Sequence, residues 1–204
     1  MMAAKTPNLL LPTAYLPPIA YFQLLCHHKQ AVVEQWESYP KQTLRNRTYI
    51  LTANGVQLLS VPVVKPNGNH TLTRDIAISY SEAWNVRHWR AIVSAYNASP
   101  YFLYYRDALE SILMQRHERL IELNEALISL VLRWLKMDCE LKYSEQFDAP
   151  TQQDTDFRYH PETIPYKEKK YYQVFDTKYP FQPNLSILDL LFNMGPEAKD
   201  YLVC

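Results

Sequence analysis

Apolar positions in the first eighty residues indicate mainly short strands, and from Trp84 onward they recur at a helical spacing. Residues 9–16 form an apolar run that suits a short strand or an extended entry. Pro17 and Pro18 then predict the start of a helix that continues through residues 19–29, because proline is tolerated in the first helical turn. Residues 31–36 follow as a strand. The order strand, helix, strand indicates a βαβ unit.

The clearest local signal is a β-hairpin over residues 48–64. Two runs rich in strand-forming residues flank Asn54-Gly55, and this pair favours a type I′ turn because both residues tolerate a positive φ. Pro62 lacks a backbone N–H, so its strand either lies at a sheet edge or ends there. A second turn at 66–69 precedes another short strand at 75–80.

The middle of the chain is predicted to be helical. Residues 84–99 indicate one helix that ends before Pro100. Leucines then recur in steps of four and three, with neither Gly nor Pro between Tyr101 and Ala149, which predicts one long amphipathic helix or two in line. Such a stripe can join two copies in a coiled coil, but in a mixed chain it more often packs on a sheet or on other helices.

The last third of the chain combines a strand at 140–147, a loop over 148–166 and a late strand within the alternating run 166–181. A short helix follows. Ser186 and Asp189 have the spacing of a capping box at its start, and Gly195 provides its C-terminal stop.

We therefore expect a single domain over residues 1–204 of the α/β class. Its core would be a mixed β-sheet with a β-hairpin, packed by several helices that include one long helix. An α+β arrangement is the alternative. The chain has 204 residues, 48% of them hydrophobic and 21% charged, which is the range of one ordinary soluble domain.

Charge and cysteine content limit the expected partners and the expected compartment of the protein. The 21 Lys and Arg residues balance the 21 Asp and Glu residues, so no overall field favours nucleic acid or an anionic membrane as a partner. The three cysteines lack the close pairing of a zinc or redox motif, which favours the reducing cytoplasm. The apolar stretches are too short for a secretory signal or a membrane span, so we expect neither.

Several kinds of chemistry are absent from the pattern. With only three glycines, the chain contains no Gly-rich phosphate loop of the GxGxxG or P-loop type. The six histidines show no HxH or HxxxH spacing, so we predict no metal site, and nothing indicates a cofactor. Cys26 lies on an apolar helix face, where an inert buried thiol is expected.

Two features point to a site. Lys41, Arg45 and Arg47 lie in a loop just before the hairpin, where arginine forks can bind a carboxylate or phosphate, although a solvated basic loop is equally compatible. His88 lies one helical turn after Trp84 and could serve as a general acid or base, since its ordinary pKa is ~6.5. The alternative for His88 is a structural role.

Asn193 requires a separate explanation. It lies in the last turn of a mostly apolar helix, so its amide must be satisfied either by neighbouring backbone or by a ligand.

Five segments in order resemble the WbqC-like protein family: PTAYLPPIAYF, YPKQTLRNRTYI, NGVQLLSVPV, WNVRHWRAIVSAYNASPYF and QPNLSILDLLFNMGPEAKDYL. The family is bacterial and is associated with O-antigen and other surface-polysaccharide gene sets. Leu11 stands where the family commonly has a glutamine, and a segment of longer members is missing, so the chain resembles a short member.

The resemblance implies a candidate site. Its catalytic residue would be His88, and its substrate-binding residues would be Tyr15, Lys41, Arg45, Asn46, Arg47, Tyr96, Tyr101 and Asn193. One hypothesis is an enzyme of surface-polysaccharide assembly that transfers an acyl or aminoacyl group to a nucleotide sugar, with an anionic small molecule as its partner. The alternative is a non-catalytic ligand-binding or assembly protein that uses its long amphipathic helix, for example as a homodimer.

Overall fold

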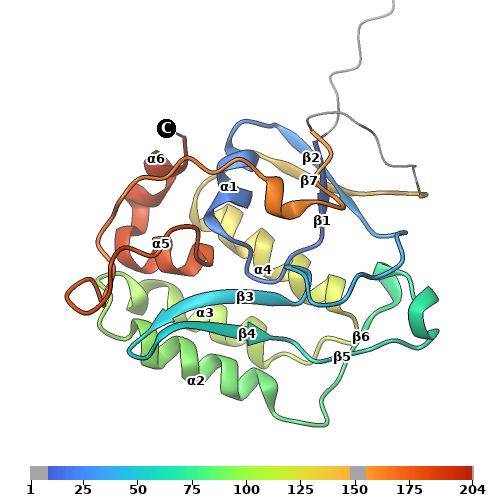
Figure 1. Ribbon diagram of the computed structural model, residues 1–204, viewed down its shortest axis with the longest axis horizontal. Helices are drawn as coiled ribbons and strands as arrows, with labels where there is room; N and C mark the ends of the chain where they lie inside the picture. The colour runs from blue at the N-terminus through green and yellow to red at the C-terminus, as the bar shows by residue number, and fades with distance from the viewer. Residues whose placement is uncertain (1–8, 148–154, 204) are drawn as a thin grey trace, which may run out of the picture.

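The computed structural model describes residues 9–147 and 155–203 and has the predicted α/β fold (Figure 1). Strands β1 (Leu9–Pro12), β2 (Gln30–Glu34) and β7 (Glu140–Tyr143) form a parallel sheet with β2 in the centre. Helix α1 (Ile19–Cys26) connects β1 to β2, which confirms the βαβ unit. Residues 155–157 run along the free edge of β1 through backbone hydrogen bonds to Leu10.

The β-hairpin is also confirmed. Strands β3 (Arg47–Thr52) and β4 (Gly55–Ser60) pair antiparallel, from Arg47 opposite Ser60 to Thr52 opposite Gly55. The turn itself differs from the expected type I′ turn at Asn54-Gly55. Its two residues are Ala53 and Asn54, and of these residues and Gly55 only the glycine has a positive φ, of 98°.

A third, smaller sheet contains β5 (Val63–Val64) and β6 (Ala77–Ile78). Pro62 lies between β4 and β5, so the second hairpin strand ends before it, as predicted. The parallel and antiparallel pairings thus fall in three separate sheets instead of one mixed sheet.

Of the two alternatives for the region after Tyr101, one long helix is wrong and two helices are observed. Helices α3 (Phe102–Met114) and α4 (Leu120–Trp134) follow α2 (Trp84–Tyr96). Between α3 and α4 the chain pairs with the segment around β6. Ile78 donates its N–H to Glu118 O, and Leu120 donates to Ile76 O. These long-range hydrogen bonds replace the helical ones, and no Gly or Pro in the sequence marks the break.

The late strand expected within 166–181 is also wrong. Residues 166–173 have no regular structure, and turns follow at 174–179. The alternating side chains instead pack on α5 (Ile187–Met194) and α6 (Ala198–Val203). Gln173 donates to Asp189 on α5, and Tyr201 on α6 donates to Lys169 O. Alternation here reflects contacts with helices and not a sheet.

Short 3₁₀ turns complete the fold at Gly68–His70, Thr73–Asp75, Pro161–Thr163 and Gly195–Glu197. Of the loop expected over 148–166, residues 148–154 lie outside the described part of the chain. The remainder contains the edge segment 155–157 and one of these turns.

Two apolar clusters share helices α4 and α5. One lies between the parallel sheet and helices α1 and α6, and the other lies between the hairpin and helices α2 and α3 (Figure 1). The leucine stripe of α3 and α4 is buried in the second cluster: Leu109, Leu113, Leu120, Leu123 and Leu127. This stripe therefore packs inside the chain on neighbouring elements. Residues 35–46 connect β2 of the parallel sheet to β3 of the hairpin, and this loop carries the candidate site.

Candidate functional site

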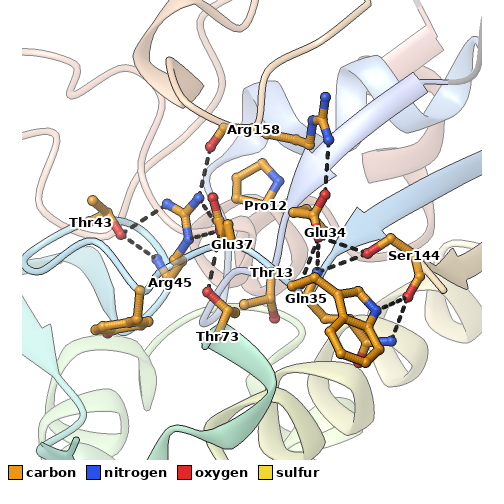
Figure 2. Close-up of polar contacts among 12 residues, drawn as sticks. Pro12, Thr13, Glu34, Gln35, Glu37, Thr43, Arg45, Thr73, Ser144 and Arg158 are labelled. Carbon is orange, nitrogen blue, oxygen red and sulfur yellow. Dashed lines mark hydrogen bonds and ion pairs between the residues drawn. The ribbon is translucent and has the colours of Figure 1, made fainter. Parts of the chain in front are cut away.

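A buried polar network lies at the carboxyl ends of the parallel strands (Figure 2). Glu34 is the last residue of β2, Thr13 follows β1, and Ser144 follows β7. In open α/β sheets, ligands bind outside the carboxyl ends of the strands, because the connecting loops diverge there. The position of the network is therefore the expected position of a site.

Glu34 ties this network to the sheet. Its Oε1 accepts hydrogen bonds from Ser144 Oγ at 2.8 Å and from the N–H groups of Gln35 and Trp36 at 2.9 and 2.6 Å. Its Oε2 forms an ion pair with Arg158 at 2.9 Å. Arg158 also donates two hydrogen bonds of 2.8 Å to the carboxylate of Asp156. Both oxygens of Glu34 are thus satisfied inside the protein.

Arg45 and Glu37 form the second half of the network (Figure 2). Arg45 is 1% exposed and donates from Nε to Glu37 Oε1 at 2.7 Å and from Nη2 to Arg158 O at 2.7 Å. Its Nη1 reaches Thr43 Oγ1 at 3.3 Å. The predicted ligand-binding arginine is therefore engaged in a buried network that orders the loop.

Glu37 is only half engaged. Its Oε2 is buried and has no hydrogen-bond partner among residues 9–147 and 155–203. Burial raises the pKa of the Glu37 carboxyl, and the ion pair with Arg45 opposes that rise.

The basic loop borders a cavity of about 470 Å³, here called the lysine cavity, with Tyr39, Lys41, Gln42, Asn46, Val63 and Lys65 in its wall. Gly68 and Asn69 also line it, and none of the lining residues in the described part of the chain is acidic. Lys65 donates to Tyr39 O at 3.0 Å, and its pKa is lowered by partial burial and by the charge of Lys41. Two uncompensated lysines favour an anion here.

Two polar atoms of the lysine cavity residues are left over. Asn46 is held by a bond of 2.9 Å from Nδ2 to Val61 O, and its Oδ1 is buried without a partner among the described residues. The same holds for the hydroxyl of Tyr39. Buried polar atoms are normally paired, so these two are suited to ligand hydroxyl or phosphate groups.

Gln42 also borders a second cavity of about 390 Å³ beside the hairpin, here called the hairpin cavity. Its wall includes Arg47, Tyr49, Tyr159 and Asn184. The Nε atom of Arg47 is buried and has no partner in the described part of the chain. The cavity wall therefore combines aromatic rings with an arginine side chain that has an unpaired N–H group.

The backbone around the hairpin cavity is strained. Gln42 and Asn184 line it with φ angles of 61° and 52°, and Leu16, at 42°, accepts bonds from the wall residues Thr48 and Ser186. Non-glycine residues seldom adopt such angles, and those that do cluster at functional sites. Asn184 Oδ1 also accepts the Ala20 N–H of α1 at 2.9 Å.

A third cavity of about 350 Å³, here called the aromatic cavity, is lined by Trp36, Glu37, Ser38, Phe147 and Tyr159. It shares Tyr159 with the hairpin cavity. The three cavities thus follow the β2–β3 loop, with Gln42 and Tyr159 as the two shared walls.

The structure places His88 and Tyr15 away from these cavities. Neither residue lines any of the three. His88 Nδ1 lies 2.9 Å from Tyr15 Oη, and the ring of Trp84 packs on the imidazole at a centroid distance of 5.2 Å. Burial lowers the pKa of His88 to about 4, and the charge of Arg87 adds to this effect. A buried, neutral imidazole fits the structural alternative for His88.

Tyr96 and Asn193 gather around Asp189 instead. Tyr96 donates to Asp189 Oδ1 at 2.9 Å, and Asn193 Nδ2 donates to Asp189 O at 2.7 Å. Tyr101 packs its ring on Gly195 so closely that a Cβ atom has no room there. Ser186 caps α5 as predicted, but the Asp189 carboxylate bonds to tyrosines and Gln173 and does not close a capping box.

The sequence pattern thus marked the basic loop but not most of the residues that surround it in the fold. Glu34 follows from the end of a predicted strand, so its position was accessible from the pattern. Glu37, Tyr39, Lys65 and Arg158 carried no local signal, because tertiary contacts bring them to the loop.

The structure also bears on membrane crossing and metal binding. None of the helices in residues 9–147 and 155–203 combines the length and apolar character that crossing a bilayer requires. The same residues contain no group of three or more histidine, cysteine or acidic side chains that could hold a metal ion.

Fold and site together define an α/β protein with ligand-sized cavities beyond the carboxyl ends of a small parallel sheet. The profile of the WbqC-like protein family matches residues 13–161 and 153–201, so the chain belongs to that family. It is similar to the uncharacterised protein Rv1507c of Mycobacterium tuberculosis, with 29% identity over 217 residues that cover 92% of this chain and 94% of the relative. No solved structure shows significant similarity to the chain.

Proposed function

We propose that this chain binds an anionic, hydroxyl-bearing small molecule of the nucleotide-sugar class, as a component of bacterial surface-polysaccharide biosynthesis. The observation that carries the proposal is the lysine cavity. Among the described residues, Lys41 and Lys65 line it without an acidic neighbour in the wall, and two buried polar atoms beside them have no partner.

An anion in the lysine cavity would relieve a repulsion that already exists. Partial burial lowers the pKa of Lys65, and the charge of Lys41 adds to this effect because the two ammonium groups repel each other. A phosphate between them would reverse this effect and raise the pKa of Lys65. The Tyr39 hydroxyl can donate to such a group, and Asn46 Oδ1 can accept from a sugar hydroxyl.

The hairpin cavity is suited to the remainder of the ligand. Tyr49 and Tyr159 offer rings on which a base or a sugar can stack, and Arg47 offers an unpaired donor. Cavities of 390 and 470 Å³ lie within the usual ~300–1,000 Å³ of small-molecule sites. Because Gln42 borders both cavities, one ligand could contact both.

Binding is better supported than transfer chemistry. An acyl or aminoacyl transfer to the bound sugar needs a group that accepts a proton, and His88 lines none of the three cavities. The proposal therefore assigns the loop residues to ligand recognition and leaves His88 outside the site.

The test is a thermal-shift screen of UDP, GDP, CMP and dTDP sugars at low salt, followed by calorimetric titration of the best ligand. We expect a rise in Tm for the parent chain, and Lys41→Ala and Lys65→Ala should each weaken binding roughly tenfold. The matched control is Lys170→Ala, which removes an exposed lysine that lines none of the three cavities.

Two results would contradict the proposal. One is that no nucleotide sugar stabilises the parent. The other is that Lys41→Ala and Lys65→Ala bind the best ligand as tightly as Lys170→Ala does. Added salt should weaken ligand binding more in the parent than in Lys41→Ala or Lys65→Ala, because salt screens the attraction between the lysines and phosphate.

A further inference from the structure

The aromatic cavity lies at the opposite end of the β2–β3 loop from the lysines and has a different chemical character. Its wall contains three aromatic side chains, one serine and one carboxylate. We propose that this cavity binds an organic ammonium group, with Glu37 as the counter-ion and Trp36, Phe147 and Tyr159 as the aromatic wall.

The first support is the unused half of the Glu37 carboxylate. Glu37 is 2% exposed, and its Oε1 receives Arg45 Nε at 2.7 Å and Thr73 Oγ1 at 3.4 Å. Its Oε2 has no partner in the described residues. A buried carboxylate oxygen without a partner costs free energy, so a ligand that brings a positive charge beside it gains more than it would from an exposed acid.

The second support is the charge balance of the surrounding network. Four carboxylates face three guanidinium groups: Glu34, Glu37, Asp75 and Asp156 against Arg45, Arg74 and Arg158. Arg158 is paired with Glu34 and Asp156, and Arg74 lies 3.6 Å from Asp75. Among these seven described groups one negative charge is in excess when all are ionised, and a bound cation would balance it.

The third support is the aromatic wall. Aromatic rings attract cations over their faces, and two of these rings already do so within the protein. Arg74 Cζ lies 4.1 Å from the ring centroid of Trp36, and Arg158 Cζ lies 5.7 Å from that of Tyr159. Phe147 and Tyr159 are still 52% and 39% exposed, so ring surface is left for a ligand.

The same features disfavour other ligands. A calcium or magnesium ion needs several oxygen ligands, whereas this wall offers one free carboxylate oxygen among aromatic rings. An anion would be repelled by Glu37. A quaternary ammonium group is weakly hydrated and matches both the charge of the carboxylate and the faces of the rings.

The probe for the test is choline chloride, compared with its neutral isostere 3,3-dimethyl-1-butanol at constant ionic strength in NaCl. Binding is followed by calorimetry and by NMR chemical shifts. We expect saturable binding of choline that is at least tenfold tighter than binding of the isostere. Phe147→Ala and Tyr159→Ala should each weaken choline binding about fivefold or more, and Glu37→Gln should abolish the preference for choline over the isostere.

The control is Tyr172→Ala, which removes an exposed aromatic side chain outside the cavity and should leave binding unchanged. Equal affinity for choline and the isostere would overturn the proposal, and so would unchanged choline binding in Phe147→Ala. If Glu37→Gln does not fold, Phe147→Ala decides the question. Phe147 is half exposed, and its truncation leaves the ion pair between Arg45 and Glu37 in place.

Binding of an ammonium group in the aromatic cavity can be tested separately from anion binding in the lysine cavity. Choline binding should persist in Lys41→Ala, and nucleotide-sugar binding should persist in Phe147→Ala. Tyr159 lines both the hairpin and the aromatic cavities, so Tyr159→Ala should affect both ligands.

Discussion

Two buried carboxylates, Glu37 and Asp189, differ in how their oxygens are satisfied. Asp189 is 1% exposed, and its Oδ1 receives Tyr96 Oη while its Oδ2 receives Tyr171 Oη at 2.6 Å and Gln173 Nε2 at 2.9 Å. No cation faces it in the described structure, yet both oxygens have donors. Glu37 has a cation, Arg45, but one oxygen remains without a partner in the same residues.

The difference separates a structural group from a candidate site. The Asp189 cluster joins α2, α5 and the segment 171–173, and its donors leave no oxygen for a ligand. A buried carboxylate whose oxygens are all paired in this way serves to fix the fold. Glu37 lines a cavity and has an oxygen to offer. Incomplete hydrogen bonding in a cavity wall is therefore the better indicator of function in this chain.

Loss of Arg158 should have the largest effect on stability. Arg158→Ala removes the guanidinium group that pairs with the buried carboxylates of Glu34 and Asp156. We expect the free energy of unfolding to fall by about 3–5 kcal/mol, measured by urea denaturation.

A matched control is Arg87→Ala. Arg87 pairs with Glu82 at 2.6 Å, but both side chains are exposed. Its loss should cost at most about 1 kcal/mol. Equal costs for Arg158→Ala and Arg87→Ala would mean that the buried network does not hold the loop.

His88 allows a test by pH. Its pKa in the fold is about 4, below the ordinary value of 6.5, so the unfolded chain binds the proton first. The stability contribution of neutral His88 is complete above pH 6.5 and is lost as the pH falls toward 4. Relative to His88→Gln, the parent should lose roughly 3 kcal/mol over this window.

The measurement is urea denaturation of both proteins between pH 7.5 and 4. Parallel pH dependences, with an NMR titration of His88 near pH 6.5, would contradict the buried neutral state. Such a result would restore His88 as a candidate acid or base.

The sequence predicted those elements that local chemistry determines. Ser186 at the cap of α5, Gly195 at its end and the glycine of the hairpin all follow from backbone preferences of single residues. The break before α4 was not predictable, because it depends on hydrogen bonds between 118–120 and 76–78. Periodicity records which side faces the core and not which distant segment lies there.

The candidate site shows the same limit. The basic cluster of Lys41, Arg45 and Arg47 before the hairpin marked the region of the cavities, because charge and position are visible in the sequence. Arg45 looked equivalent to Arg47, yet its partner Arg158 lies 113 residues away and makes it structural. Only the tertiary structure could distinguish the two arginines.

Removal of the Asp189 charge should have an intermediate effect. Asp189→Asn places an amide NH₂ group among donors from Tyr96, Tyr171 and Gln173, so at least one hydrogen bond is lost. We expect a cost of about 1–3 kcal/mol near neutral pH.

The pH dependence of Asp189→Asn provides an internal check. Burial raises the pKa of Asp189, so the folded state keeps its proton to higher pH than the unfolded state. The contribution of this group is therefore greatest below the unfolded pKa of about 3.9 and declines as the pH rises through the folded value. The free energy of unfolding of the parent, relative to that of Asp189→Asn, should therefore be higher in acid than near neutral pH. A difference that stays constant with pH would argue against the raised pKa.

The smallest effect on stability is expected for Tyr39→Phe. The Tyr39 hydroxyl is buried without a partner in the described residues, so its removal leaves no donor unpaired and should change the free energy of unfolding by less than about 0.5 kcal/mol. Tyr171→Phe is the matched variant, and it should cost about 1–3 kcal/mol because it takes a donor from Asp189. If the Tyr39 hydroxyl serves a ligand, Tyr39→Phe should weaken nucleotide-sugar binding, whereas Tyr171→Phe should not. A large loss of stability in Tyr39→Phe would show that its hydroxyl belongs with the satisfied groups around Asp189, and the lysine cavity would lose one of its two unpaired atoms.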